Sequence, residues 1–362
     1  MTETEACIAL NMVPNLGPMR LRKLLDVFET PERVLATKGA ELRTVEGIGT
    51  DLSRAIAGWE ETVDLPGELK RIEEFGAHVV TRASPEYPRE LQQIYNPPIL
   101  LYVWGTLTER DHRAVSVVGS RKTSHYGLEC AKRLSYQIAY AGLTVVSGLA
   151  RGIDTAAHQG ALAAGGRTVA VIGSGLMDLY PPENLGLAEK IAQSGAVVSE
   201  FPMTFPPDRQ TFPYRNRIVA GWGNGLLVVE AGMKSGALIT AGQALEHGRN
   251  VYAVPGQIDR PSAMGSNKLI QQGAKLVMAA SDILDDLGTL FPQPTPQAAA
   301  ASGNLSPDEE LLLTHLDSTE TPLDTLITAT GLPAARASTA LLMLEMKRRV
   351  KQLPGQLFVR LG

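Results

Sequence analysis

The segment AVSVVGSRK (Ala114–Lys122) passes from an apolar run into a loop of small residues, and this pattern occurs four times. The other copies are LTVVSGLARG (Leu143–Gly152), RTVAVIGSG (Arg167–Gly175) and LLVVEAGMKSG (Leu226–Gly236). We expect each apolar run to form a strand, with a helix behind the loop. A loop of Gly and Ser lets a ligand approach the backbone, and the helix start offers free N–H groups and a positive dipole end. Four such junctions, with arginines in or beside them, predict a ligand that carries several phosphates.

The middle of the chain, residues 82–290, alternates such apolar runs with helical patterns. Most runs lack polar alternation and are rich in Val, Ile and Leu, as in parallel strands that are buried on both faces. Strands are expected near 114–118, 143–147, 167–172, 196–199, 226–230, 250–254 and 275–278, and helices near 125–141, 153–164, 213–221 and 236–247. The repetition predicts the α/β class, with an extended Rossmann-like, doubly wound and mostly parallel sheet. Ligands of such sheets bind outside the carboxyl ends of the strands, where all four loops fall.

Two helical parts flank this region. Residues 1–80 contain VEGIGTDLSRAI (Val45–Ile56), whose Gly-x-Gly turn is typical of a helix-hairpin-helix motif. Such a turn can offer backbone N–H groups to a DNA phosphate. The segment Asn15–Leu25 is a weaker second copy of this motif. A helical packing module without a ligand is the alternative. Residues 291–304, rich in Pro, Ala and Gln, are predicted to be a linker. The sequence of residues 305–362 indicates three helices and a hairpin, which predicts a winged-helix domain. Acidic and basic residues are balanced in this domain, so contact with a protein is at least as well supported as contact with DNA.

Composition argues against several classes of protein. The 362 residues include 34 Lys and Arg against 38 Asp and Glu, so that nucleic acid would have to bind to a local basic patch. Cys7 and Cys130 lie far apart and without metal-ligand spacing, so we expect no disulfide, no bound metal and a reducing, cytoplasmic compartment. We find no signal-peptide pattern and no apolar run long enough to span a membrane. Because no Walker A, G-x-S-x-G or H-E-x-x-H sequence occurs, we expect no enzymatic activity and no cofactor.

Polar and aromatic residues at the strand ends form the candidate site. Arg121 can clamp a phosphate through two parallel N–H bonds, and Gly119 and Ser120 beside it suit close approach. Between Phe201 and Arg217 rings are interleaved with arginines, which suits a single strand whose bases stack while its phosphates are paired. The residues that we expect to bind DNA are Gly119, Ser120, Arg121, Lys122, Ser147, Gly148, Arg151, Gly173, Ser174, Arg209, Phe212, Arg215, Asn216, Arg217, Lys234, Ser235 and Gly236.

Acidic residues near these loops allow structural alternatives. The arginines could pair with Glu200 and Glu230 while some of the rings fill the core. For Glu230 we expect a buried, hydrogen-bonded pair with Arg217. Asp154 is expected to cap the helix that follows it, with His158 one turn later on the same face. These two side chains could act as a general acid and base, or form a local structural hydrogen bond.

Seven segments of the chain stand in a familiar order. They are GSRKTSHYG, SGLARGIDTAAH, RTVAVIGSG, SEFP, FPYRNRIVAG, VVEAGMKSGALITAGQALEHGR and VYAVPG. In these segments, from about Leu91 to Gln272, the chain resembles the DprA (Smf) family of bacterial DNA processing proteins. The resemblance implies an extended Rossmann-like domain that binds single-stranded DNA, flanked by a SAM-like or helix-hairpin-helix domain and a winged helix. It also implies a homodimer that hands incoming strands to the RecA recombinase during natural transformation.

The resemblance also assigns roles to residues. The Arg of the family's G-S-R loop holds DNA, which points here to Arg121, and the further basic residues are Arg151, Arg215, Arg217 and Lys234. Members of the family often carry a Lys shortly after the S-E motif. In this chain the first basic residue after that motif is Arg209, which comes later in the sequence. The expected function is a non-enzymatic single-stranded DNA-binding protein that protects incoming DNA and loads RecA. The alternative is a nucleotide-processing enzyme similar to the LOG-type nucleosidases, which carry P-G-G-x-G-T where this chain has Glu230–Gly236.

Overall fold

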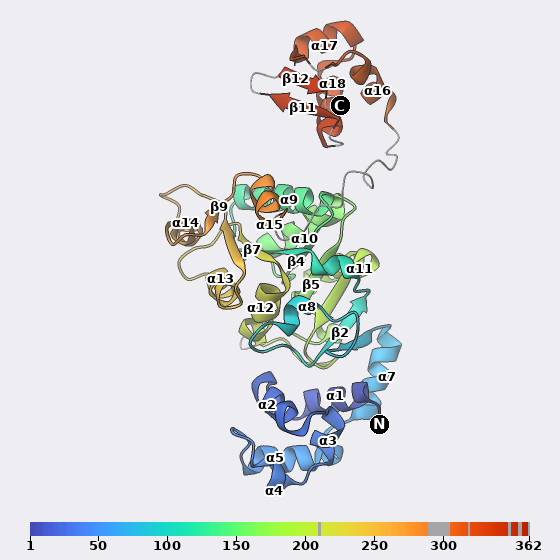
Figure 1. Cartoon of the computed structure of the whole chain (residues 1–362), viewed down its shortest axis with the longest axis vertical. Helices are drawn as coiled ribbons and strands as arrows, with labels where there is room; N and C mark the ends of the chain where they lie inside the picture. Colours follow the sequence, from blue (N-terminus) through green and yellow to red (C-terminus); the bar gives the residue numbers. More distant parts are fainter. Residues whose placement is uncertain (209–210, 289–304, 318, 347–348, 354–356, 361–362) are drawn as a thin grey trace. The chain divides into compact units, whose positions relative to one another are not determined.

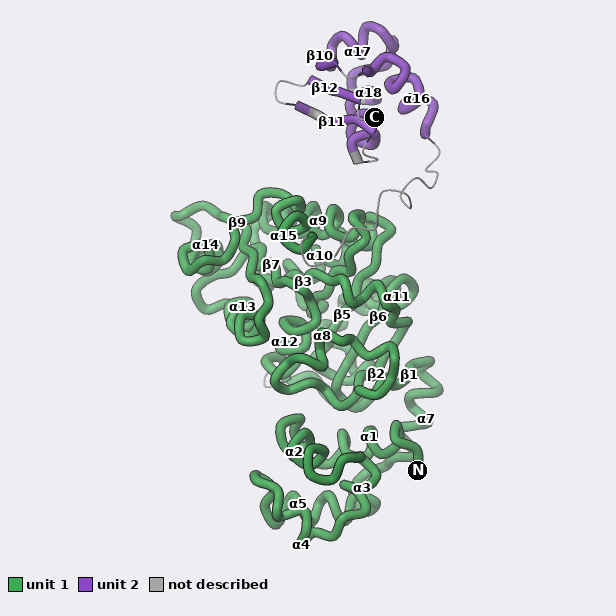
Figure 2. The backbone as a smooth tube through the Cα atoms, viewed as in Figure 1, with its two compact units in different colours: residues 1–291 green, residues 292–362 purple. Residues whose placement is uncertain are grey.

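Figure 1 shows the computed structural model of the chain, which describes residues 1–208, 211–288, 305–317, 319–346, 349–353 and 357–360. The chain forms two compact units, residues 1–291 and 292–362, drawn in green and purple in Figure 2. The predicted linker at 291–304 and the candidate Arg209 lie outside the described residues. The predicted domain boundaries stay predictions. Among the described residues, no helix combines the length and the apolar character that crossing a bilayer needs.

Short helices open the first unit. They are α1 (Glu3–Met12), α2 (Pro18–Phe28), α3 (Pro31–Ala36), α4 (Gly39–Leu42), α5 (Thr50–Ala57), α6 (Trp59–Thr62) and α7 (Leu65–Phe75). Gly47 turns the chain between α4 and α5 with a φ of 86°, and the next residue, Ile48, is buried. Asn15 does the same between α1 and α2 with a φ of 62°, and Leu16 is buried in turn. The two turns therefore share one geometry, at the two places where the sequence pattern suggests a hairpin.

A nine-stranded sheet follows, in the order β1-β2-β6-β5-β4-β3-β7-β8-β9. Its strands are β1 (His78–Thr81), β2 (Leu100–Gly105), β3 (Ala114–Val118), β4 (Thr144–Ser147), β5 (Thr168–Ile172), β6 (Ala196–Ser199), β7 (Gly225–Val228), β8 (Asn250–Ala253) and β9 (Lys275–Leu276). Strands β3 to β9 run parallel, as the apolar runs predict. Strands β1 and β2 add an antiparallel edge that those runs did not predict. The doubly wound, mostly parallel α/β sheet is confirmed.

Helices cover both faces of this sheet because its strands are apolar on both sides. One face packs against α9 (His125–Tyr140), α10 (Ile153–Ala163), α11 (Leu185–Ser194) and α15 (Ser281–Gly288). The other packs against α8 (Arg89–Gln92), α12 (Thr211–Trp222), α13 (Gly236–Glu246) and α14 (Met264–Gln271). Single 3₁₀ turns stand at η1 (Glu109–His112), η2 (Leu176–Asp178) and η3 (Pro182–Asn184). Within β3, Val117 faces the first layer and Val118 the second.

The order of the strands marks one place on the sheet. The chain starts its parallel strands at β3 in the centre, proceeds outward through β4, β5 and β6, and then returns to place β7 on the other side of β3. The loops after β3 and β7 leave the same edge and turn toward opposite faces of the sheet. In open parallel sheets such a switch point leaves a crevice at the carboxyl ends of the strands, where ligands bind.

The second unit is a small helical body with a three-stranded sheet in the order β10-β12-β11. Its elements are α16 (Pro307–Thr314), β10 (Thr321–Pro322), α17 (Leu323–Thr330), α18 (Ala334–Met346), β11 (Val350–Leu353) and β12 (Leu357–Arg360). The predicted winged helix is confirmed, with β10 as an added short strand. Arg336 at the start of α18 forms two hydrogen bonds to Asp308, at 2.7 and 2.9 Å. This charge is therefore neutralised within the unit itself.

Candidate nucleic-acid interface

The crevice between the carboxyl ends of β3 and β7 is a cavity of about 760 Å³. The loop after β3, the loop after β4 with the start of α10, the loop after β7 with the first turn of α13, and the first residues of α12 line it. Its polar and aromatic lining comprises Ser120, Arg121, Lys122, Asp154, Phe212, Arg215, Asn216, Lys234, Ser235 and Thr240. Segments that are far apart in sequence thus converge on one hollow at the switch point of the sheet.

Three cations stand exposed around this cavity: Arg121, Lys122 and Lys234. None of them forms an ion pair with a residue that the structure describes. Cations gathered at a concave site raise the local concentration of anions. The cavity is therefore a basic patch on a chain whose formal net charge is −4.

Glu230, two residues beyond β7, holds the loop that follows β3. Its backbone carbonyl accepts the N–H of Ser120 at 2.7 Å. Its carboxylate accepts the hydroxyl of Thr123 at 2.5 Å, and both the N–H and the hydroxyl of Ser124 at 2.9 Å. Burial alone would raise the pKa of Glu230, but hydrogen bonds from Ser262, Thr123 and Ser124 outweigh it and lower that pKa. Glu230 is thus ionised, and it fixes the loop after β3 at Ser120 and at Thr123–Ser124.

Two arginines and two rings form a row along the edge of the sheet. The guanidinium carbon of Arg121 lies 4.9 Å from the centre of the Phe212 ring. The centres of the Phe212 and Tyr180 rings are 6.0 Å apart, and the guanidinium carbon of Arg151 lies 5.6 Å from that of Tyr180. Arg151 also forms an ion pair with Glu183. Rings beside arginines can stack on bases while phosphates are paired, so the row suits a single strand.

Arg215 lies buried beneath this row, with only 4% of its surface exposed. It donates to the carbonyl of Val171 at 2.7 Å, while Asp154 accepts the N–H groups of Gly148 at 3.2 Å and Ala150 at 3.4 Å. Burial lowers the pKa of Arg215 to about 10 and raises that of Asp154 to about 6, although each charge favours the other. These two groups brace the ends of β4 and β5 from below.

Arg217 does not line the cavity and forms a buried ion pair with Glu200, in which both N–O distances are 2.5 Å. The expected pair between Arg217 and Glu230 is therefore wrong, because the carboxylate of Glu230 serves the loop after β3. The alternative in which an arginine of α12 pairs with Glu200 is the one that the structure has. With both partners below 10% exposure, the pair belongs to the interior of the protein.

His158 and Asp154 form separate structural bonds instead of a catalytic pair or a bond to each other. Nδ1 of His158 lies 2.7 Å from the hydroxyl of Thr168 on β5, and the side chain is fully buried. Burial, assisted by the charge of Arg215, lowers the pKa of His158 to about 3, so the ring is neutral near pH 7. A neutral, buried imidazole bonded to a hydroxyl supports the sheet and has no route to a substrate.

The predicted DNA-binding residues that the structure describes, all except Arg209, fall into three groups. Those that line the cavity are Gly119, Ser120, Arg121, Lys122, Phe212, Arg215, Asn216, Lys234, Ser235 and Gly236. Gly148 and Arg151 line a smaller hollow beside it. Ser147, Gly173, Ser174 and Arg217 line neither hollow. The hydroxyl of Ser147 instead donates to Val117 at 2.6 Å, and the carbonyl of Gly173 accepts the hydroxyl of Thr211 at 2.5 Å. The contribution of the whole set to DNA binding stays a prediction.

Tyr180 is the main residue of this region that the sequence pattern missed. It contacts both Phe212 and Arg151, yet it lies on a loop between β5 and α11, far from either in sequence. Its one signal in the sequence is that it closely follows the loop Gly173–Gly175, in a chain with few aromatic residues. Only the fold brings its ring into the row.

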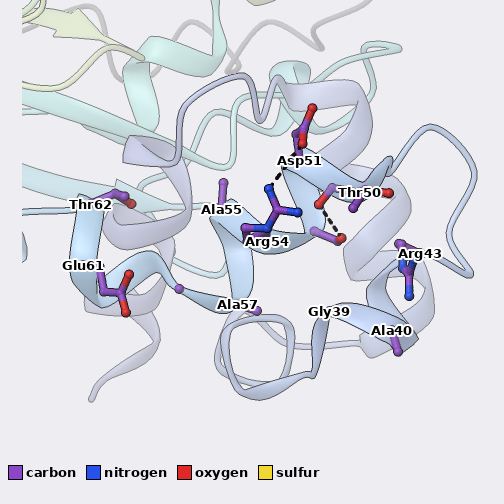
Figure 3. Close-up of a pocket in the computed structure, with 12 residues that line it drawn as sticks. Gly39, Ala40, Arg43, Thr50, Asp51, Arg54, Ala55, Ala57, Glu61 and Thr62 are labelled. Carbon is purple, nitrogen blue, oxygen red and sulfur yellow. Dashed lines mark hydrogen bonds and ion pairs between the residues drawn. The ribbon is translucent and has the colours of Figure 1, made fainter.

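A second cavity, of about 670 Å³, lies among the N-terminal helices (Figure 3). In that view Arg54 reaches toward Asp51, and the nearest N–O distance between them is 3.5 Å. The remaining charges of the lining are Arg43 and Glu61, so cations and anions balance. Without an excess of positive charge or an aromatic side chain in its lining, this cavity is a poorer candidate for nucleic acid.

Comparisons with known proteins agree with this geometry. The family model of DNA recombination-mediator protein A matches residues 78–288, and that of the DprA winged helix domain matches residues 293–356. The chain is 33% identical over 388 residues to Protein Smf of Synechocystis sp., with 98% of each chain covered. It is 43% identical over 224 residues to DNA processing protein DprA of Bacillus subtilis, covering 62% of this chain and 75% of that protein.

Two solved structures are similar to this fold. The X-ray structure of DNA processing protein A from Streptococcus pneumoniae superposes with a TM-score of 0.69 at 35% identity, covering 79% of this chain and 98% of that one. A structure of DNA processing protein A from Helicobacter pylori, described for its single-stranded DNA binding mode, gives a TM-score of 0.54 at 25% identity. It covers 59% of this chain and 97% of that one.

Proposed function

Since the chain belongs to the DprA (Smf) family of DNA recombination-mediator proteins, we propose that it binds single-stranded DNA in the crevice between β3 and β7 and passes the strand to a recombinase of the RecA type. The resemblance seen in the sequence motifs is thereby confirmed as a family relationship. DNA binding is supported by the charge and rings of the crevice and by the described binding mode of the Helicobacter pylori relative. Transfer to RecA rests on the family resemblance.

The observation that carries the proposal is the row Arg121–Phe212–Tyr180–Arg151. A duplex hides its bases inside the stack, so rings of this kind have no base to stack on unless the strand is single. Each base stacked on an aromatic side chain contributes roughly 1–3 kcal/mol, and every base has a π-face. The row therefore favours single-stranded DNA over duplex and imposes little sequence preference.

Phosphate contacts fall to Arg121, Lys122 and Lys234, because these cations are exposed and unpaired among the described residues. The guanidinium of Arg121 can hold one phosphate through two N–H groups, whereas the lysines act as point charges. Arg215 is buried and already bonded to Val171, so its charge acts on the strand from below. Affinity carried by phosphate pairing falls as salt is added.

A nucleotide-processing enzyme is the weaker candidate. Glycosidic bond cleavage needs an acid or base that can reach the reacting atoms. The carboxylate of Glu230 is occupied by Thr123 and Ser124, and Asp154 is buried beneath two backbone N–H groups. A protein that only binds and transfers DNA has no need of such a group, so we propose that the chain is not an enzyme.

A homodimer is also part of the proposal. At one end of the sheet, β9 pairs only with β8 in the nine-stranded order, and the chain between β8 and α15 exposes large apolar side chains. Ile258 is 93% exposed, Met278 72% and Met264 49%. Open sheet edges and clustered apolar side chains favour association with a second surface. Sedimentation velocity over a range of concentrations would report a dimer, and a concentration-independent monomer would count against it.

The test of DNA binding is a titration with one oligonucleotide sequence, presented single stranded and as a duplex, at two salt concentrations. We expect tighter binding to the single strand and a marked loss of affinity at the higher salt, because paired phosphates release counterions. Equal affinity for duplex and single strand would remove the ring-stacking argument. Release of free base from nucleoside monophosphates would instead favour the enzyme.

A further inference from the structure

We propose that a groove next to the crevice, lined by Phe201, Phe205, Tyr214 and the turn Asn15–Gly17, is a second stacking subsite for the same DNA strand. The inference rests on the proposed function and extends it to a site that the sequence motifs do not include. The groove has a volume of about 510 Å³ and lies within the first unit, between the α1–α2 hairpin and the segment after β6.

Aromatic side chains give this groove its character. The rings of Phe201 and Phe205 stack with centres 4.9 Å apart and an angle of 26° between their planes. Phe205 is 36% exposed and Tyr214 55% exposed, although large apolar surfaces are ordinarily buried. A stacked pair of rings and a further exposed ring in the same lining offer nucleobases an apolar surface on which to stack.

The groove and the crevice are both lined by the first residues of α12. The first residues of α12 alternate between the two hollows: Phe212 and Asn216 line the crevice, whereas Thr211 and Tyr214 line the groove. An α-helix with its side chains is roughly 10–12 Å across. A strand held at Phe212 therefore reaches the groove by passing over this single turn, and its next bases meet Tyr214.

The walls of the groove are fixed from several directions. The side-chain amide of Asn11 donates to the carbonyl of Glu200 at 2.9 Å, and the carboxylate of Glu68 accepts the N–H of Met203 at 2.7 Å. The carbonyl of Phe205 accepts the N–H of Gly175 at 2.8 Å. Because these contacts already fix the walls of the groove, little conformational entropy is lost when a ligand binds, which favours binding.

Charge in the groove fits bases better than phosphates. The carboxylate of Glu200 is neutralised by Arg217, and Arg20 is the cation of the lining. This is one cation, against the three that stand exposed around the crevice, so the groove offers less to phosphates. A peptide could also contact the rings, but the crevice lies only one turn of α12 away, which favours the DNA strand as the occupant. We therefore assign the rings to bases and leave phosphate pairing to the crevice.

The test compares oligothymidines lengthened by one nucleotide at a time. For the unaltered protein we expect affinity to rise in a first stage as the crevice fills and then in a second stage as bases reach the groove. The variants Tyr214→Ala and Phe205→Ala should keep the first stage and lose most of the second, a loss of roughly tenfold in affinity for the longer strands. Tyr140→Ala is the matched control, because Tyr140 is an exposed ring stacked on Tyr136 of α9, outside the lining of both hollows.

A second measurement uses 2-aminopurine, a fluorescent base that is quenched when it stacks, placed at successive positions of a long strand. Quenching at the bases beyond the crevice should disappear in Tyr214→Ala and persist in Tyr140→Ala. If neither ring variant changes the second stage or the quenching, the groove is not a subsite, and the crevice proposal still stands. If the unaltered protein binds none of these strands, the proposed function itself fails.

Discussion

The mouth and the floor of the crevice are both rich in charge, yet they differ in what the charges contact. At the mouth, Arg121 and Lys122 are exposed and have no ionic partner among the described residues. On the floor, Arg215 is bonded to a strand carbonyl, and Arg217 is paired with Glu200. A cation in water is ready to exchange counterions for phosphates, whereas a buried cation is already committed to the protein. The arginines of α12 therefore stabilise the fold, whereas Arg121 and Lys122 are the cations that we propose for the ligand.

Breaking the floor should have the largest effect. Replacing Arg217 by Met leaves Glu200 buried without its partner, which typically costs about 3–5 kcal/mol. We expect the urea midpoint of the first unit to fall accordingly. Single-strand affinity, measured where the variant is still folded, should stay close to that of the unaltered protein.

A double variant tests whether the lost stability comes from the unpaired charge of Glu200 or from the changed packing at residue 217. Replacing Glu200 by Gln in the Arg217→Met protein removes the stranded charge, so part of the lost stability should return. If Arg217→Met instead weakened DNA binding tenfold while leaving the midpoint unchanged, Arg217 would belong to the mouth and the comparison would collapse.

The second floor prediction concerns pH and Asp154, whose pKa is raised from an ordinary 3.8 to about 6 by burial. Between these values the folded protein binds a proton that the unfolded chain releases, so the stability that protonation supplies is full below 3.8 and is lost as the pH rises through 6. The loss amounts to roughly 3 kcal/mol, at 1.36 kcal/mol for each unit of pKa. Asn at this position has no such proton.

We expect the stability of Asp154→Asn, relative to the unaltered protein, to improve between pH 4 and about pH 6 and then to level off toward pH 7, as measured by urea unfolding. The amide oxygen of Asn can still accept the N–H groups of Gly148 and Ala150, so the loop keeps its support. His158, whose lowered pKa gives the opposite slope, is present in both proteins and cancels in the difference. A difference that did not change with pH would show that the Asp154 carboxyl is not buried as described.

At the mouth, Arg121→Ala should leave stability within about 0.5 kcal/mol, because the side chain is exposed. Loss of a charge-assisted phosphate contact should weaken single-strand binding by about tenfold. The slope of log affinity against log salt should become shallower by about 0.7, the value for one phosphate of a single strand.

The control for this variant is Arg110→Ala. Arg110 is an exposed arginine in η1, just before β3 and so at the opposite end of the strand from Arg121. It should change neither the affinity nor the salt slope, which a titration at several salt concentrations will decide. Equal effects of the two substitutions would mean that net charge, and not the crevice, governs binding.

The sheet could be predicted from the sequence because its parallel strands are apolar on both faces and end in small residues, a pattern that polar surface strands do not show. Strand β1 (His78–Thr81) escaped prediction because four residues are too few to show a period. Its neighbour β2 (Leu100–Gly105) is a stronger run, but no Gly/Ser loop follows it to mark it as part of the βα series.

The site could be predicted only in part, and the difference lies in contacts between distant residues. Arg121 was predicted from its own loop, and the structure places it at the mouth of the crevice. Arg215 and Arg217 look equally basic in the sequence, but burial of α12 against the sheet decides their role. The partner of Glu230 could not be deduced, because Thr123 and Ser124 lie over a hundred residues away and reach it only once β3 and β7 are paired.

The smallest effect is expected for Glu230→Gln, which tests whether the buried carboxylate of Glu230 holds the loop that carries Arg121. A neutral amide keeps the shape of the side chain but accepts fewer and weaker hydrogen bonds from Thr123 and Ser124. The loop that carries Arg121 should then be less well ordered, and single-strand affinity should fall by a few fold. In the double variant with Arg121→Ala, most of this loss should vanish, because a loop without its arginine gains little from being held. Additive losses in that cycle of four titrations would mean that Glu230 affects DNA by another route and does not act as a positioning residue for Arg121.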